Sequence, residues 1–266
     1  MIKKITLYTL IGIGIILGCS KDSDDSTPPN NGIDKRANLQ TTGSSGHDIL
    51  ANTNFDALLI EIGYVEGFRP TTTAMTNFEN FIRERTFKTN IEFIYKSLPS
   101  PDEETLTTEE VAELEEENRT AYNNGSTLAM YIYFSDAPSD SDEQDEGVFT
   151  LGAVYRNTSM VIYESTIRQL ASQSNFITVS DVETATLSHE FAHLLGLVNL
   201  GTDPINDHED TEAANHCNVS GCLMRAELQF GVPTMKLLEK NAAKGAAPVP
   251  GLDAECILDL QNNGGR

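Results

Sequence analysis

The chain has 266 residues, of which 39% are hydrophobic and 22% charged, so a globular protein with one good core is expected and a disordered chain is excluded. Its 18 lysines and arginines stand against 40 aspartates and glutamates, giving a net charge of -22. This balance argues against a nucleic-acid partner, because such binding needs clustered positive charge.

The N-terminus combines a short basic region, residues 1–4, with an apolar run over residues 5–17. The run is too short to span a membrane comfortably as a mature helix, but it suits the apolar part of a signal peptide. It ends in "ILGC", which resembles a bacterial lipobox, where signal peptidase cuts before a cysteine that then carries lipid. We therefore expect a signal peptide over residues 1–18, lipid on Cys19, and a location in the outer membrane or at the cell surface.

The residues after Cys19 are rich in Ser, Asp, Asn, Gly, Pro and Thr and poor in apolar side chains. This composition predicts a flexible stalk over residues 19–48. Within it, "SKDSDDSTPP" resembles the acidic tether of surface lipoproteins of Bacteroidetes-type bacteria. The folded domain is expected over residues 49–266, with an N-terminal subdomain over 49–196 and a C-terminal subdomain over 197–266.

The first half of the folded part alternates between predicted strands and helices. β-Rich or apolar stretches predict strands, and apolar residues at helical spacing predict helices. Strands are expected within 55–67, 90–98 and 126–138, with one or two more within 148–165, and helices within 71–86 and 107–122. This order, followed by one long helix, predicts an α/β (α+β) fold with a mixed, twisted sheet. Thr107 and Glu110 are expected to form a capping box.

The long helix carries the chemistry. Its sequence, "TLSHEFAHLLGLVNLG" at 186–201, contains His189-Glu190-x-x-His193. Histidines four residues apart stack on one face of a helix, so both imidazoles can reach one cation, with Glu190 near the water bound to it. A buried pair of histidines without a ligand would be costly. The motif therefore predicts a zinc centre with Glu190 as the general base.

The ends of this helix are also marked in the sequence. Ser180 and Glu183 are expected to form a capping box at its start, and Gly196 to end it in a left-handed turn. In metalloproteases whose motif continues His-x-x-Gly-x-x-His, a third histidine follows the glycine. In this chain Asn199 occupies that position, and a neutral amide is a poor zinc ligand.

The third zinc ligand is therefore expected elsewhere. Besides the helix pair, the chain has three histidines: His47 in the expected stalk, and His208 and His216 after the helix. The segment "HCNVSGCLM" at 216–224 resembles the archaemetzincin pattern, in which a ligand histidine is followed at once by Cys-x4-Cys-x-Met.

The resemblance implies that His216 is the third ligand, displaced by a 19-residue insertion over 197–215, with His208 as the alternative. It also implies that Met224 is the methionine of a metzincin Met-turn beneath the zinc, although packing in the core is the ordinary role of a methionine. As a whole, the chain is also similar to the lipoprotein "membrane metalloproteases" of Bacteroidetes-type bacteria.

Three further cysteines follow the helix, Cys217, Cys222 and Cys256. Archaemetzincins bind a second, structural zinc with the help of a late Cys-x-x-Cys, where this chain has Cys256-x-x-Asp259. One alternative is a zinc held by the three thiolates and the Asp259 carboxylate, but loss of the fourth thiolate in an oxidising compartment favours a disulfide. The spacing does not determine which two cysteines would pair.

The resemblance implies a metzincin-like zincin fold with a small irregular C-terminal subdomain, and a monomeric, zinc-dependent endopeptidase. Its expected substrates are proteins or peptides, which would add as a further strand beside an edge strand within 149–159. The lipid is expected to hold the enzyme at the membrane. One alternative is a gluzincin-type peptidase with Glu209 or Glu212 as the third ligand. The other is a non-catalytic surface-binding lipoprotein on a degenerate protease scaffold.

Replacement of Cys19 by serine should release the protein from the membrane, because the thiol that would carry the lipid is removed. In a detergent phase-partitioning experiment, the wild type should enter the detergent phase and the variant the aqueous phase. Equal partitioning of the two proteins would contradict the anchor.

Overall fold

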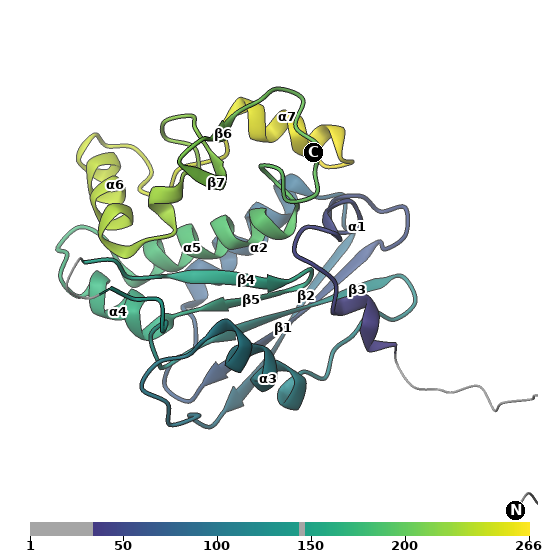
Figure 1. Ribbon diagram of the computed structural model, residues 1–266, viewed down its shortest axis with the longest axis horizontal. Coiled ribbons are helices and arrows are strands. Elements are labelled where there is room, and N and C mark those ends of the chain that lie inside the picture. The colour runs from purple at the N-terminus through teal and green to yellow at the C-terminus, as the bar shows by residue number, and fades with distance from the viewer. Residues whose placement is uncertain (1–33, 144–146) are drawn as a thin grey trace, which may run out of the picture. The chain divides into compact units, whose positions relative to one another are not determined.

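A five-stranded sheet is the central element of the computed structural model, which describes residues 34–143 and 147–266 (Figure 1). The expected signal peptide and Cys19 lie outside these residues. The strand order is β2-β1-β3-β5-β4, with β1 at Ala57–Val65, β2 at Asn90–Leu98, β3 at Thr127–Phe134, β4 at Gly152–Arg156 and β5 at Ser159–Ile162. All neighbours are parallel except β4 and β5, so the predicted mixed α/β sheet is confirmed.

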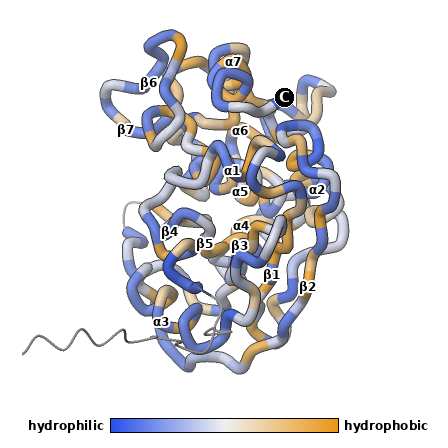
Figure 2. The backbone as a smooth tube through the Cα atoms, turned by 90° about the vertical axis from the view of Figure 1, so that its right-hand side faces the viewer, coloured by the Kyte–Doolittle hydropathy of each residue, from blue (hydrophilic) through white to orange (hydrophobic). Residues whose placement is uncertain are grey.

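Helices cover both faces of the sheet (Figure 1). The helices α2 at Thr72–Arg85, α4 at Glu164–Ala171 and α5 at Val179–Leu194 lie on one face, and α3 at Thr108–Asn118 lies on the other. The central strand β3 is consequently apolar along its length and buried from Leu128 to Phe134, as expected of a parallel strand covered on both faces. In Figure 2 the tube is mostly orange along β1 and mostly blue around α3, whose outer face is acidic.

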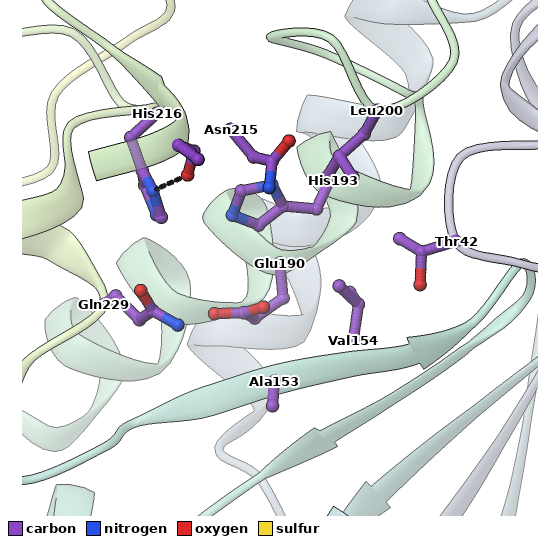
Figure 3. A pocket seen from close by; sticks show the side chains of 10 residues that line it. Thr42, Ala153, Val154, Glu190, His193, Leu200, Asn215, His216 and Gln229 are labelled. Carbon is purple, nitrogen blue, oxygen red and sulfur yellow. Dashed lines mark hydrogen bonds between the residues drawn. The ribbon is translucent and has the colours of Figure 1, made fainter. Parts of the chain in front are cut away.

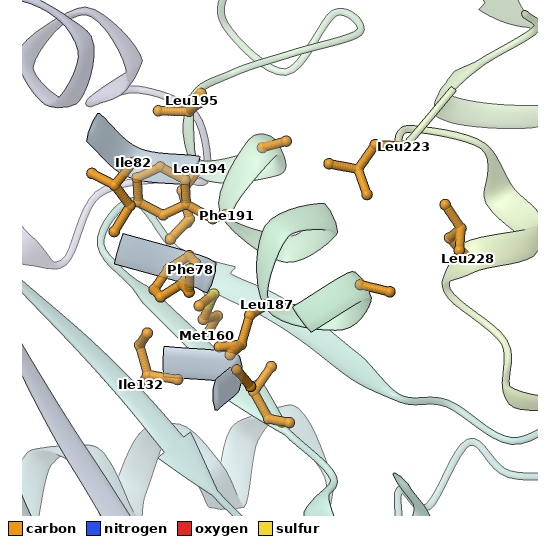
Figure 4. Close-up of a cluster of buried hydrophobic side chains, with 14 of the residues drawn as sticks. Phe78, Ile82, Ile132, Met160, Leu187, Phe191, Leu194, Leu195, Leu223 and Leu228 are labelled. Atoms are coloured by element: carbon orange, nitrogen blue, oxygen red, sulfur yellow. The ribbon is translucent and has the colours of Figure 1, made fainter. Parts of the chain in front are cut away.

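The helix α5 is buried on all sides from Val182 to Leu194. On the sheet side it packs against α2, where the rings of Phe78 and Phe191 meet edge to face with centroids 5.3 Å apart (Figure 4). Such a pair adds to the free energy gained by burying the rings. The packing fixes how α5 is rotated about its axis, and therefore the direction in which its histidines point.

One of the two predicted capping boxes is confirmed and the other is wrong. Thr107 and Glu110 cap α3 as expected. At α5 the cap is formed by Thr178 and Asp181, two residues before the expected pair. Glu183 instead lies in the buried interface with α2, where it accepts hydrogen bonds from the backbone N–H and the hydroxyl group of Thr71.

The predicted boundary between the stalk and the domain at residue 49 is also wrong. Residues 35–38 form a 3-10 helix, η1 at Lys35–Asn38, and α1 at Gly46–Leu50 packs against the end of α5. Asn38 is fully buried, and its amide donates to the carbonyl oxygen of Ala129 in β3 at 2.9 Å. A polar side chain is tolerated in a core when its hydrogen bonds are made, and composition does not reveal these bonds.

The chain after α5 forms the small irregular C-terminal part that was expected. It contains a two-stranded hairpin, a 3-10 helix and two helices: β6 at Glu209–Asp210, β7 at Ala213–Cys217, η3 at Ala226–Leu228, α6 at Gly231–Ala243 and α7 at Ala254–Asn262. In the described part of the chain, no helix is both long and apolar enough to cross a membrane.

Candidate metal centre

Three buried histidines meet between α5 and the hairpin strand β7. His189 and His193 come from α5, and their Nε2 atoms are 3.2 Å apart. His216 comes from β7, and its ring centroid lies 5.4 Å from that of His189 and 5.1 Å from that of His193. One nitrogen of each ring lies within 4.8 Å of the other two. The structure thus brings the predicted third ligand to the helix pair.

Backbone carbonyl groups orient two of the three rings. The Nδ1 atom of His189 donates to the carbonyl oxygen of Leu223 at 2.7 Å. The Nδ1 atom of His216 donates to the carbonyl oxygen of Ala214 at 2.9 Å, which is the dashed line in Figure 3. A carbonyl oxygen only accepts, so each ring carries its proton on Nδ1 and its lone pair on Nε2. In metal sites, such a bond from the other ring nitrogen fixes the tautomer and the orientation of the ligand.

The donor set fits a zinc ion. Two imidazole lone pairs 3.2 Å apart repel one another unless a proton or a cation lies between them. With Zn–N distances of about 2.0–2.1 Å, a tetrahedral ion separates two ligand nitrogens by about 3.3–3.4 Å. Burial lowers the pKa of His189 to about 4 and that of His193 well below its usual value, so the neutral imidazole, which binds metals, is the stable form.

Glu190 lies beside the histidines but outside the group that they form. Its carboxyl group is buried, and its Oε1 atom has no hydrogen-bond partner in the described part of the chain. Burial raises the pKa of Glu190 to about 8. A cation held by the neighbouring histidines would favour the carboxylate form of Glu190, because opposite charges lower a carboxyl pKa.

A cleft of about 390 Å³ opens above these side chains (Figure 3). One wall is β4, which lies at the end of the sheet, so the prediction of an edge strand within 149–159 is confirmed. The opposite wall comes from β7 and the residue that follows η3. Besides Glu190, His193 and His216, the lining residues are Thr42, Ala153, Val154, Leu200, Ala214, Asn215 and Gln229. An extended chain placed along β4 would therefore pass over Glu190.

The segment that was predicted to form a Met-turn supports the histidines through its backbone. Leu223 supplies the carbonyl group that orients His189, and the carbonyl oxygen of Met224 accepts from the N–H of Cys217, the residue after His216, at 2.7 Å. The side chain of Met224 is fully buried in the core. The position of its thioether beneath a zinc ion stays a prediction.

The other ligands considered from the sequence lie outside the three-histidine group. His208 bonds through Nε2 to Asp259 at 2.7 Å, and His47 bonds through Nδ1 to the carbonyl oxygen of Asn263 at 2.8 Å. Neither Glu209 nor Glu212 belongs to a metal-type cluster within residues 34–143 and 147–266.

A second group of possible metal ligands is formed by His208, Cys217, Asp253 and Cys256, whose ligand atoms all lie within 4.8 Å of one another, and Cys222 lies beside Cys256. Cys217, Cys222 and Cys256 are free and buried, so the disulfide favoured from the sequence is absent from the described residues. The Sγ atoms of Cys222 and Cys256 are 3.6 Å apart, whereas the sulfurs of a disulfide are about 2.05 Å apart. The Nδ1 atom of His208 lies 3.3 Å from the Sγ atom of Cys217 and 4.0 Å from that of Cys256.

Sequence reasoning assigned no role to His208 in this cluster. The available signal was Asp259, which follows Cys256 at the spacing of the missing fourth cysteine. The Asp259 carboxylate accepts a hydrogen bond from the Nε2 atom of His208, which leaves the Nδ1 atom turned toward the thiols. The segment over 197–215 thus brings His208 to the thiols of Cys217 and Cys256, and the chain then returns to the first group of histidines at His216.

Comparisons with known proteins find similar solved structures at low sequence identity. No family model and no curated protein matches the chain. Among solved structures, it is similar to archaemetzincin from Methanopyrus kandleri, with 13% identity, a TM-score of 0.45, and coverage of 79% of this chain and 96% of that chain. It is also similar to metalloproteinase-II from Bacteroides fragilis, with 13% identity, a TM-score of 0.41, and coverage of 88% of this chain and 58% of that chain.

Replacement of Gly152 by alanine should displace Glu190. A methyl group at Gly152 would lie 2.8 Å from the Cγ atom of Glu190 and 2.9 Å from the Cγ2 atom of Thr186, so the buried side chains must shift. We expect a loss of about 1–3 kcal/mol in the free energy of unfolding, the usual cost of overpacking a core. Urea unfolding measures this free energy. The control is Gly251→Ala, because no atom lies within 4 Å of a methyl group added at Gly251. Equal stability of the two variants would contradict the packing described at Glu190.

Proposed function

We propose that this protein is a zinc-dependent endopeptidase whose catalytic metal is held by His189, His193 and His216. The observation that carries the proposal is the convergence of three buried imidazoles, two of them oriented by backbone carbonyl groups, beside a buried glutamate at the base of a cleft. A set of three protein ligands is typical of catalytic zinc sites, because it leaves a position for water.

The proposed mechanism follows from the position of Glu190 beside the histidines at the base of the cleft. When bound, the zinc ion would supply a Lewis acid that acidifies a water molecule and polarises the scissile carbonyl group. Glu190 takes a proton from the attacking water and later delivers it to the leaving amine. Because its Oε1 atom has no other partner among the described residues, this carboxylate is free to move the proton. The carbonyl groups of Leu223 and Ala214 meanwhile hold His189 and His216 in their orientations.

The substrate is an extended segment of a protein or peptide. Ala153 and Val154 of the edge strand β4 line the cleft, and an edge strand can add a further strand through main-chain hydrogen bonds. Such bonds recognise any peptide backbone, so the side chains around the cleft would set the specificity. We further propose that the enzyme acts as a monomer and that lipid on Cys19 holds it at the outer membrane or cell surface, which rests on the sequence pattern at residues 1–19.

We also propose a second, structural zinc held by Cys217, Cys222, Cys256 and His208. The Asp253 carboxylate lies within the same group and accepts a hydrogen bond from the thiol of Cys217 at 3.1 Å. With Zn–S distances of about 2.3 Å, a tetrahedral ion separates two thiolates by about 3.8 Å, and the thiols of Cys222 and Cys256 are 3.6 Å apart. His208 supplies the ligand in place of a fourth cysteine, and Asp259 fixes its orientation. Four protein ligands leave no open position, so this ion would stabilise the C-terminal part and take no part in hydrolysis.

Replacement of Glu190 by glutamine should abolish most of the peptidase activity without removing metal. The amide cannot take a proton from water, so we expect the rate to fall about 100-fold or more, the usual scale for a general base. Hydrolysis of casein and of a peptide library measures the activity, and elemental analysis measures the bound zinc. The control is Glu212→Gln at the exposed tip of the hairpin. Wild-type rates in Glu190→Gln would overturn the mechanism, and a wild type that binds zinc but cleaves no peptide would favour the non-catalytic binding protein.

Alanine variants of three histidines should separate the two metal sites. The wild type should hold two zinc ions per chain. His216→Ala should lose one ion together with activity, because the catalytic ion keeps only two ligands. His208→Ala should lose the other ion and unfold at a lower temperature. His47→Ala, which removes a histidine outside both clusters, should keep both ions.

Elemental analysis of each variant measures the bound zinc, peptide hydrolysis measures the activity, and thermal unfolding measures the unfolding temperature. A His216→Ala protein with full zinc and full activity would contradict the proposed third ligand. If activity disappears in His208→Ala while His216→Ala stays active, His208 is the catalytic ligand and the second site is wrong as assigned.

A further inference from the structure

We infer that Glu209 is a positioning residue that ties the chain leaving α5 to the strand that carries His216, and that it thereby holds the third histidine at the metal centre. The inference rests on the metal centre proposed above. It assigns a role both to Glu209 and to Asn199, which occupies the position where a third histidine would follow the helix motif.

The carboxylate of Glu209 bridges two segments that are 16 residues apart in the chain. Its Oε2 atom accepts a hydrogen bond from the side-chain amide of Asn199 at 2.6 Å. Its Oε1 atom accepts one from the backbone N–H of Asn215 at 2.7 Å. Both oxygens are engaged in this way, which also argues against Glu209 as a metal ligand.

The two tied segments adopt backbone conformations that need such support. Asn199 has φ 66°, Asn215 has φ 63°, and the preceding β-branched residue Val198 has φ 53°. Left-handed backbone is uncommon outside glycine and is maintained when surrounding contacts hold it. Glu209 bonds to two of these three residues, Asn199 and Asn215, and so fixes both ends of the loop between them.

The tie at Asn215 acts directly on the third histidine. Asn215 precedes His216, and Ala214 supplies the carbonyl group that orients the His216 ring at 2.9 Å. The hairpin that contains these residues is short, with β6 at Glu209–Asp210 and an irregular register against β7. A two-stranded hairpin of this size is marginally stable by itself. The position of His216 therefore depends on bonds between the hairpin and the rest of the chain, and Glu209 provides one of them, to the segment that follows α5.

The conservative variant Glu209→Gln separates a positioning role from a role of the negative charge. The glutamine Oε1 atom can still accept from the backbone N–H of Asn215. Its amide N–H can donate to the oxygen of Asn199 if the Asn199 amide turns over, so both bonds of the bridge can form again. Alanine removes both bonds. If Glu209 were a metal ligand, glutamine would fail as alanine does, because an amide is a poor zinc ligand.

The experiment measures metal affinity in the full-length chain. Zn²⁺ affinity of the histidine centre is measured by chelator competition, and Co²⁺ substitution identifies the site, because thiolate ligands give an intense charge-transfer absorption that an all-histidine site lacks. Glu209→Ala should weaken binding at the histidine centre about 10- to 100-fold, the usual effect of losing a group that orients a ligand. Glu209→Gln should restore most of the affinity, and Glu212→Ala, in the same hairpin, should change nothing.

Asn199→Ala tests the other end of the bridge. It should weaken binding in the same direction as Glu209→Ala, and the double variant should be no weaker than Glu209→Ala alone, because both substitutions break one connection. The visible Co²⁺ absorption bands should shift in Glu209→Ala and return to their wild-type positions in Glu209→Gln. A substitution that only lowered the overall stability would lower the unfolding temperature without shifting these bands.

The outcomes separate this inference from the proposed function. A wild type that binds no metal at the histidines overturns the metal centre and the inference with it. Metal binding that is equally tight in the wild type and in Glu209→Ala overturns the inference alone. Loss of metal in Glu209→Gln to the same degree as in Glu209→Ala also overturns it, because the charge of Glu209 would then be what matters.

Discussion

The burial of two histidines on one face of an apolar helix is the constraint on which the rest of the structure depends. The Nε2 atoms of His189 and His193 lie 3.2 Å apart among buried side chains, and their lone pairs repel one another unless a proton or a cation lies between them. The sheet and α2 cover one side of α5, and the chain after α5 covers the other side. This second layer supplies the carbonyl group of Leu223, the ring of His216 and one wall of the cleft.

The segment over 197–215 connects the two groups of possible metal ligands. It leaves α5 at Gly196, where φ is 80°, brings His208 to the thiols of Cys217 and Cys256, and returns through β7 to present His216 to the helix histidines. The N–H of Cys217 bonds the carbonyl oxygen of Met224, so the residue after His216 is tied to the turn that orients His189. The two clusters therefore share a short piece of backbone, and a change in the thiol cluster should be transmitted to the third histidine.

The sequence predicted those parts of the fold and site that depend on local patterns. The strands β1, β2 and β3 and the helices α2, α3 and α5 lie where periodicity placed them, and the i, i+4 spacing of His189 and His193 required one shared face. The start of the domain could not be predicted, because Asn38 is buried through bonds to residues about 90 positions away. The position of His208 beside the thiols could not be predicted either, because it depends on a hydrogen bond to Asp259, 51 residues further along the chain.

The most direct test of a zinc centre formed by the three histidines is anomalous diffraction at the zinc absorption edge, from crystals of the full domain grown with zinc. The account predicts an anomalous peak about 2.0–2.1 Å from one ring nitrogen of each of His189, His193 and His216. It also predicts that Glu190 lies beside this peak without coordinating it. The absence of a peak at this position, or a peak coordinated by a side chain other than His216 as the third ligand, would contradict the account.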